Sequence, residues 1–181
     1  MKRPILASLI IASALAVIAL ILTMRSAIHR EAVQQVPAGV RNVSVSIDNE
    51  KFDLKDGFAE NPAAPGSSAK NTVRIVGEPA LGDATGDGKP EAALVIANDS
   101  GGSGTFYYAV VAVDHGGSYR ATNVIALGDR ISPQSVTFTD GHFVYRFLER
   151  KSGEPMAATP SMETTVPIHV DAATDTISVG S

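Results

Sequence analysis

The chain contains no cysteine and no tryptophan, and it has four histidines among its 181 residues. Without cysteine it can form no disulfide bond and cannot carry a lipid-modified N-terminal cysteine. It shows no internal repeat, which excludes the tandem arrays that build propellers and solenoids. It also lacks the H-x-x-H and H-E-x-x-H spacings of zinc sites. These absences leave a small domain that must be stabilised by its apolar core.

Positive charge is scarce in most of the chain. All 19 acidic residues and 11 of the 15 basic residues lie in residues 31–181, which gives this part a net charge of −8. Such a domain has no basic surface for nucleic acid, and anionic lipid would repel it. We therefore predict no nucleic-acid partner and a domain that faces the outside of the cell.

An uncharged segment of 21 residues, Pro4 to Met24, follows Lys2 and Arg3. As a helix rising about 1.5 Å per residue, it spans about 30 Å, the thickness of a bilayer's hydrocarbon core. Cleavable signals have apolar regions of only about 7 to 15 residues, and the nearest small-x-small sequence, Ala14-Leu15-Ala16, lies inside the apolar run. The sequence favours an uncleaved transmembrane anchor over residues 1–24, with a cleaved signal peptide as the alternative.

The remainder is long enough for one domain with its own core. Residues 25–40 predict a juxtamembrane tether, in which Ala27 to Val36 prolongs the helix and Pro37-Ala38-Gly39 ends it. Residues 41–181 predict a single extracytoplasmic domain.

Apolar and polar residues alternate with a period of two in several segments of this domain, which is the pattern of half-buried strands. Asp56-Gly57 and Asp140-Gly141 are strong hairpin signals. Strands of this kind are predicted at 43–47, 52–54, 119–127, 136–138, 143–147, 164–170 and 176–179. Two segments rich in Pro, Gly and Ser, Asn61 to Ala69 and Ser152 to Ser161, predict surface loops.

Two further segments are continuously apolar, Ala92 to Ala97 and Phe106 to Val113. They predict strands covered on both faces, at the centre of the fold. Eight or nine short strands without a confident helix favour a mainly antiparallel sheet structure. The predicted fold class is therefore mainly β, with an N-terminal transmembrane helix followed by one antiparallel β-sandwich or barrel domain.

Acidic and hydroxyl side chains recur at two-residue spacing in the segment Asp83 to Glu91, DATGDGKPE. Ca²⁺ takes six to eight oxygen ligands, and a loop with side chains at positions 1, 3 and 5, a glycine at 6 and a carbonyl at 7 can wrap one ion. A simpler interpretation competes with a metal site. In it, the segment is an Asp/Gly-rich turn whose carboxylates accept backbone N–H groups.

This segment and the apolar residues that follow it, Ala92 to Val95, resemble the calcium loop and strand of FG-GAP and VCBS repeats. The resemblance implies ligand roles for Asp83, Thr85, Asp87, the carbonyl of Lys89, and Glu91. Those repeats occur in tandem and build propellers, whereas this chain has one copy, so only the loop is carried over. Thr85 offers a hydroxyl where the pattern has a carboxylate or amide, and Leu94 stands where an EF-hand has its bidentate Glu. A Ca²⁺ ion in this closed loop is expected to be structural.

Three further segments follow the acidic loop: Gly101 to Tyr108 (GGSGTFYY), Leu127 to Ile131 (LGDRI) and Gly153 to Met156 (GEPM). In this order they are similar to a family of small bacterial envelope proteins of uncharacterised function, over about residues 40–170. The resemblance implies a single extracytoplasmic domain. Together with the predicted anchor, this gives a single-pass protein of the bacterial inner membrane whose domain faces the periplasm or the cell exterior. It implies no activity.

No catalytic or cofactor-binding residue is assigned. Ser100 to Gly104 lacks the Lys-Ser/Thr ending of a P-loop, and Thr105 stands where G-x-S-x-G requires glycine, so the segment predicts a flexible loop. A triad would have to combine Asp114-His115 with Ser100 or Ser103, but nothing in the sequence brings them together. The four histidines are too far apart in sequence to indicate a metal set.

Arginine and aromatic residues leave two interpretations open. Asp129-Arg130 and Glu149-Arg150-Lys151 predict structural ion pairs, with recognition of a ligand carboxylate or an acidic sugar as the functional alternative. The tyrosines predict core positions, with a carbohydrate platform as the alternative. They are Tyr107, Tyr108, Tyr119 and Tyr145, to which Phe106 can be added.

Two classes of function stay open. The first is a non-catalytic binding or structural module, held by its membrane helix and acting through a loop face on an envelope protein or glycan. The second is a small envelope hydrolase, or an inhibitor of an envelope or host enzyme.

Overall fold

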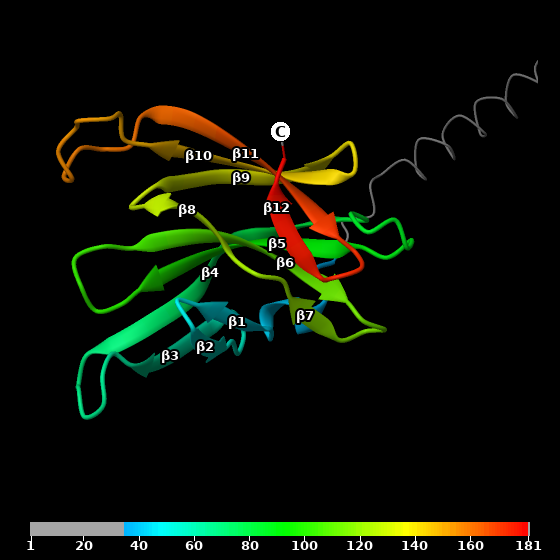
Figure 1. The fold of residues 1–181 in the computed structure, drawn as a ribbon, viewed down its shortest axis with the longest axis horizontal. Helices are drawn as coiled ribbons and strands as arrows, with labels where there is room; N and C mark the ends of the chain where they lie inside the picture. The colour runs from blue at the N-terminus through cyan, green and yellow to red at the C-terminus, as the bar shows by residue number, and fades with distance from the viewer. Residues whose placement is uncertain (1–34, 181) are drawn as a thin grey trace, which may run out of the picture. The chain divides into compact units, whose positions relative to one another are not determined.

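A computed structural model describes residues 35–180 of the chain, shown in Figure 1. The predicted transmembrane helix and most of the predicted tether lie outside these residues. Within residues 35–180, no helix has the length and apolar character needed to cross a membrane. The described residues form twelve strands and one short 3-10 turn, η1 (Ala38–Arg41).

The strands follow one another along the chain with short connections. In chain order they are β1 (Ser44–Ile47), β2 (Glu50–Asp53), β3 (Phe58–Pro62), β4 (Lys70–Gly82), β5 (Glu91–Asp99), β6 (Phe106–Asp114), β7 (Tyr119–Ala121), β8 (Ile125–Asp129), β9 (Ser132–Thr139), β10 (His142–Glu149), β11 (Met162–Asp171) and β12 (Thr176–Val179).

The strands build two sheets and one separate hairpin, and every pairing is antiparallel. The larger sheet has the order β3-β4-β5-β6-β7, and β8 also pairs with β6. The smaller sheet has the order β12-β11-β10-β9, and β1 pairs with β2. The prediction of a mainly β, antiparallel structure is confirmed.

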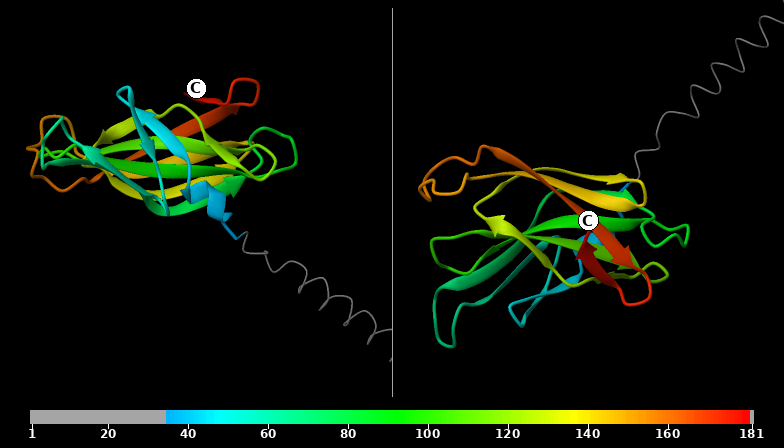
Figure 2. Two further views of the ribbon diagram at one scale, coloured as in Figure 1. Left: turned by 90° about the horizontal axis from the view of Figure 1, so that it is seen from below. Right: turned by 45° about the horizontal axis from the view of Figure 1, so that its top comes forward.

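The centre of the fold lies at β5 and β6, as their apolar runs predict. Alternate side chains of these strands enter two different cores. Leu94 and Val110 pack with the β1–β2 hairpin on one face of the large sheet, and Val95 and Val111 pack with the small sheet on the other. Figure 2 shows the large sheet between these two layers. Because both faces are covered, the strands are apolar at nearly every position.

The turn at residues 140–141 fixes how the small sheet begins. Asp140 and Gly141 have φ angles of 51° and 80°. Two positive φ angles in a two-residue loop define a type I′ turn, whose twist matches that of the flanking strands. Asp140 tolerates this conformation and glycine adopts it freely. The predicted hairpin of β9 and β10 is therefore confirmed.

Two features differ from the sequence prediction. The expected strand 119–127 is divided into β7 and β8, because the hydroxyl of Thr122 accepts a hydrogen bond from the Val111 N–H at 3.1 Å and interrupts the ladder. The sequence also missed β4, the longest strand, and placed Asn61 and Pro62 in a loop although both belong to β3.

The chain joins the domain through residues 36–41. Val40 is fully buried, and Val36 packs against the same core as the β1–β2 hairpin. A side chain at Gly39 would touch the ring of Tyr119 on β7 at 3.0 Å. The last residues of the predicted tether range, 25–40, thus pack on the domain beside β7.

Candidate functional site

The long central strands separate two groups of loops. We call one group the acidic-loop end; it comprises the connections 83–90, 115–118 and 172–175. We call the other the Arg150 end; it comprises the connections 100–105, 130–131 and 150–161. Figure 1 shows the two groups at opposite sides of the domain. Strand β6, with nine residues, runs between them and corresponds to a separation of about 30 Å.

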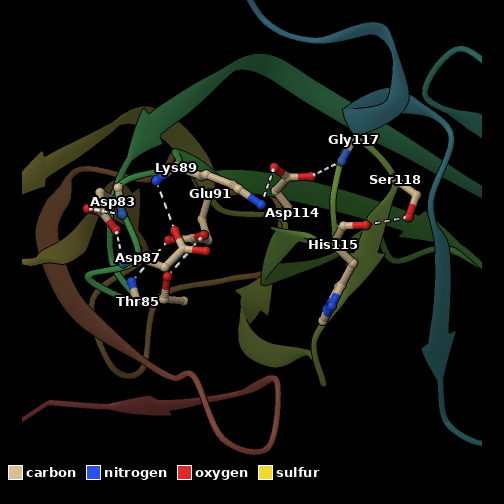
Figure 3. Close-up of polar contacts among 10 residues, drawn as sticks. Asp83, Thr85, Asp87, Lys89, Glu91, Asp114, His115, Gly117 and Ser118 are labelled. Atoms are coloured by element: carbon tan, nitrogen blue, oxygen red, sulfur yellow. Dashed lines mark hydrogen bonds and ion pairs between the residues drawn. The ribbon is translucent and has the colours of Figure 1, made fainter.

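At the acidic-loop end, Asp83 organises the connection between β4 and β5. Its Oδ1 accepts hydrogen bonds from the N–H groups of Gly86 at 2.7 Å and Asp87 at 3.1 Å, and its Oδ2 accepts one from Gly88 at 3.0 Å. Gly86 and Gly88 have positive φ, which lets the loop curl around the carboxylate. Figure 3 shows the Asp83 side chain in this loop beside Asp87. Asp83 therefore holds the loop closed through backbone donors.

Glu91, the first residue of β5, is completely buried beneath this loop. Its Oε2 accepts hydrogen bonds from the N–H groups of Ala84 at 2.8 Å and Thr85 at 3.0 Å. Burial raises the pKa of the Glu91 carboxyl, the two backbone hydrogen bonds lower it, and the nearby charges of Asp87 and Asp83 raise it further. The Glu91 carboxylate thus accepts two backbone hydrogen bonds but lies near the negative charges of Asp87 and Asp83.

The other three predicted ligands make local contacts. Asp87 Oδ1 accepts the N–H of Lys89 at 2.8 Å. The Lys89 side chain turns away and its Nζ lies 3.8 Å from Asp114, and the Thr85 hydroxyl lies 3.4 Å from Glu91 Oε1. The structure therefore places all five predicted residues in one small loop, as Figure 3 shows.

These oxygens do not form a ready cage for a metal. Within residues 35–180, no three His, Cys, Asp or Glu side chains are gathered closely enough to hold an ion. Asp83 and Glu91 are instead acceptors for the backbone of their own loop. Each carboxylate has about four lone-pair positions, so these bonds leave acceptor capacity. A bound Ca²⁺ ion would have to draw Asp83, Asp87 and Glu91 together, and the calcium site stays a prediction.

A second polar cluster joins the two sheets at the same end. Asp175, in the turn before β12, accepts a hydrogen bond from His115 Nε2 at 2.8 Å, and its carboxylate lies 3.7 Å from Arg120. His115 follows β6 and Arg120 lies in β7, so this carboxylate of the small sheet binds two residues of the large one. The ion pairs are consistent with a structural role.

The serine and histidine considered for a triad are far apart. Ser103 precedes β6 at the Arg150 end, and His115 follows β6 at the acidic-loop end. The partner of His115 is Asp175, not the neighbouring Asp114. A nucleophile and its base must come within hydrogen-bond reach, and these two do not.

At the Arg150 end, one arginine holds two connections together. The guanidinium of Arg150 donates to the carbonyl of Asp129 at 3.0 Å and to that of Arg130 at 3.3 Å, and it lies 3.9 Å from the sulfur of Met156. Arg130 has a φ of 50°, which non-glycine residues rarely adopt. Arg150 therefore stabilises the unusual backbone conformation at Arg130 by donating hydrogen bonds to the carbonyl groups of Asp129 and Arg130.

The predicted ion pair of Arg130 is also present. Its guanidinium donates to both carboxylate oxygens of Asp129, at 2.9 to 3.1 Å. The pKa of Arg130 is raised further because Asp129 hydrogen-bonds to its charged form. The N–H of Arg130 also donates to the carbonyl of Thr105 at 2.7 Å, which ties in the glycine-rich connection before β6.

The three segments GGSGTFYY, LGDRI and GEPM thus meet at this end. A groove of about 360 Å³ lies between the second and third of these segments, lined by Gly128, Asp129, Ile131, Glu149, Arg150, Lys151, Glu154 and Met156. Three large apolar side chains are exposed at the same end: Phe106 by 41%, Met156 by 52% and Met162 by 40%. Sequence order alone could not show this convergence, because it depends on strand register.

Comparisons with family models, with curated proteins and with solved structures give no match for this chain. The resemblances to the calcium loop and to the envelope family therefore stay predictions, and the function is argued from the two ends of the domain.

Proposed function

We propose that this chain is a non-catalytic, membrane-anchored extracytoplasmic module that binds a partner protein through its Arg150 end. The observation that carries the proposal is the meeting of three distant segments around Arg150, with Phe106, Met156 and Met162 exposed beside them. Loops held in place by a rigid sheet are where binding residues concentrate.

The chemistry of this end suits a protein partner. Aromatic, methionine and arginine side chains are enriched at protein interfaces, and methionine adapts its shape to the surface it meets. The groove carries both carboxylates and basic groups, Glu149 and Glu154 against Arg150 and Lys151. This pattern of mixed charge beside apolar side chains resembles the rim and core of an interface.

The first described residues of the chain join the domain at a distance from this end. Residues 36–41 join the domain beside Tyr119 of β7, and β7 follows the connection 115–118 at the acidic-loop end. In this proposal residues 1–24 remain as an uncleaved helix in the inner membrane. Retention of the protein in the membrane pellet after alkaline extraction, with the full mass of the chain, supports the anchor. Release of a shorter chain supports the cleaved signal peptide.

Binding is tested by placing a photo-crosslinking residue at Met156 of the full chain in its native membrane. The matched control is Val179 on β12, which is 57% exposed but lies in the strand at the edge of the small sheet. We expect one discrete protein adduct from position 156 and none from position 179. An Arg150→Ala change should weaken the adduct, because the carbonyl groups of Asp129 and Arg130 lose their donor. No adduct, or equal adducts at both positions, would contradict the proposal.

We propose in addition that the loop Asp83 to Glu91 takes up a structural Ca²⁺ ion. The supporting observation is geometric: Asp83 and Asp87 lie in the short connection that ends at the buried Glu91, while Lys89 Nζ lies 3.8 Å from Asp114. A divalent cation would relieve the repulsion among the three carboxylates. Its oxygen ligands would be those of Asp83, Thr85, Asp87, Lys89 and Glu91.

A further inference from the structure

Two histidines that are distant in sequence lie face to face on the outside of the small sheet. In the register of β10 and β11, Phe143 lies opposite Ile168, so His142 and His169 are the next opposing pair. Their rings are stacked, with centroids 4.9 Å apart and planes inclined by 27°. His142 is half-buried and His169 is exposed.

We infer that His142 and His169 form a binding site for a divalent transition-metal ion of the zinc, copper or nickel class. Imidazole nitrogen is a preferred ligand of these ions, and two opposing histidines on adjacent strands can chelate one of them. The remaining coordination positions are filled by water. This site is independent of the proposed calcium loop, because Ca²⁺ takes oxygen ligands.

The hydrogen bonding of His142 prepares one of its nitrogens for a metal. Its Nδ1 lies 3.3 Å from the carbonyl oxygen of Asp140. A carbonyl oxygen only accepts, so Nδ1 carries the hydrogen and Nε2 retains its lone pair. A carbonyl partner on the second nitrogen is the usual support of a metal-binding histidine.

The separation of the rings suits chelation. With metal–nitrogen distances of about 2.0 to 2.1 Å, two imidazoles on one tetrahedral ion have ring centres on the order of 5 Å apart. The observed 4.9 Å is in this range. The rings must turn from their stacked arrangement to direct their nitrogens at one point. This needs rotation about the Cβ–Cγ bond, whose torsion is broad.

The positions directly opposite the two histidines on the flanking strands are uncharged. Thr139 lies opposite His142 on β9, and Ser178 lies opposite His169 on β12. Gly180 lies beneath the ring of His169, since a Cβ atom there would be 2.5 Å from Nε2. The ring of His169 can therefore occupy this position only because residue 180 has no side chain.

The experiment is a competition titration of the full chain in detergent, stripped of metal, with Zn²⁺ and a chromogenic chelator. We expect one Zn²⁺ ion to be lost, or bound at least tenfold more weakly, in His142→Gln and in His169→Gln. The matched control His115→Gln, whose histidine pairs with Asp175 at the acidic-loop end, should bind like the wild type. Added Ca²⁺ should not displace the ion.

A fourth variant tests the geometry without removing a nitrogen. Gly180→Ala places a methyl group against His169, and it should weaken Zn²⁺ binding while both histidines remain. Circular dichroism and the thermal midpoint show that each variant is folded. The inference is overturned if the wild type binds no Zn²⁺. It is equally overturned if both histidine variants bind Zn²⁺ as the wild type does.

Discussion

The side-chain amide of Asn123 pairs with both backbone polar groups of Ile177. Its Oδ1 accepts the Ile177 N–H at 2.7 Å, and its Nδ2 donates to the Ile177 carbonyl at 3.1 Å. Asn123 lies between β7 and β8 of the large sheet, and Ile177 lies in β12 at the edge of the small one. One side chain thus takes the place of a neighbouring strand and closes part of that edge.

Replacing Asn123 with alanine should lower the free energy of unfolding by about 1 to 3 kcal/mol, because two backbone groups of Ile177 lose their partner. Asn123→Asp should also destabilise, because a carboxylate would face the Ile177 carbonyl without a donor. Chemical denaturation of the full chain in detergent measures both. Gln134→Ala is the control, since among the described residues that side chain bonds only to Ser132 and Pro133 beside it. Equal stability of Asn123→Ala and this control would contradict the assignment.

Gly82, at the end of β4, lies directly against the ring of Phe138 on β9. A Cβ atom at position 82 would be 2.1 Å from Cγ of Phe138, and Gly82 has no positive φ, so the constraint is space. Gly82→Ala should cost about 1 to 3 kcal/mol through overpacking. Gly102→Ala, where nothing lies within 4 Å, should be close to neutral. Adding Phe138→Leu to Gly82→Ala should recover part of the loss, and strictly additive effects would contradict the contact.

Tyr145 places a hydroxyl in the core between the sheets. It donates to the carbonyl oxygens of Val110 at 3.0 Å and Leu94 at 3.3 Å. Tyr145→Phe should therefore cost about 1 to 2 kcal/mol. Tyr107→Phe is the control, because the Tyr107 hydroxyl makes no hydrogen bond to the described residues.

The same residue predicts an alkaline limit of stability. Burial raises the pKa of the Tyr145 hydroxyl. Above pH of about 10 the unfolded chain loses this proton while the folded chain keeps it, so the free energy of unfolding falls as the pH rises. Tyr145→Phe should show a shallower fall between pH 9 and 11 than the wild type, measured by urea unfolding at each pH. Identical slopes would contradict the prediction.

The centre of this fold could be predicted from the sequence, and its edges could not. The continuous apolar residues of β5 and β6, and the Asp140-Gly141 turn, determine local structure by themselves. Strand β4 was missed because polar residues and a proline interrupt its alternation, as at Arg74, Glu78 and Pro79. Glu78 and Pro79 are tolerated because β3 no longer pairs with the strand beyond Arg74.

The candidate sites, like the strands, could be predicted from the sequence only where their residues are continuous in the chain. The acidic loop is continuous in sequence, so its residues could be identified from the sequence. The sequence could not show which of their oxygens accept hydrogen bonds from the backbone. The contact of Arg150 with Asp129, and the stacking of His142 on His169, depend on strand register and on the packing of loops. No local pattern contains that information, because each pair comes from different strands or connections.

The stability of the wild type relative to the Glu91→Gln variant should increase in mild acid. Because burial raises the pKa of Glu91 above its ordinary value, the folded state binds the proton more tightly than the unfolded chain does. Its contribution is complete below the ordinary pKa of about 4.3 and is lost as the pH rises through the raised value. Between pH 7 and pH 4.5, the wild type should gain stability relative to Glu91→Gln, as measured by urea unfolding.

Other acidic groups change the stability of the wild type and of Glu91→Gln equally, so their effects cancel in the difference between the two. The pKa of Asp53 is lowered chiefly by a hydrogen bond from Lys51, and that of Asp171 chiefly by the Ala173 N–H. These groups favour folding at neutral pH and lose that effect in acid. A constant difference between the wild type and Glu91→Gln across this pH range would show that the Glu91 carboxyl is not buried as described.

Calcium should raise the thermal midpoint of the full chain after treatment with EDTA, if the loop takes up an ion. Ligand binding to the folded state alone stabilises it by about 2.7 kcal/mol when the free ion is at 100 times its Kd. Asp83→Asn and Asp87→Asn should abolish this shift. Asp140→Asn is the control, because Asp140 is an acid at a turn outside the loop and asparagine tolerates the same positive φ.

The ion should also change the behaviour of Glu91. A cation among Asp83, Asp87 and Glu91 would favour the ionised carboxylate and so oppose the effect of burial on its pKa. The acid-dependent gain of the wild type over Glu91→Gln should therefore shrink when Ca²⁺ is present. If Ca²⁺ shifts neither the midpoint nor this difference, Asp83 and Glu91 act only as acceptors for the backbone of their loop, because the hydrogen bonds from Gly86 and Ala84 then account for both carboxylates.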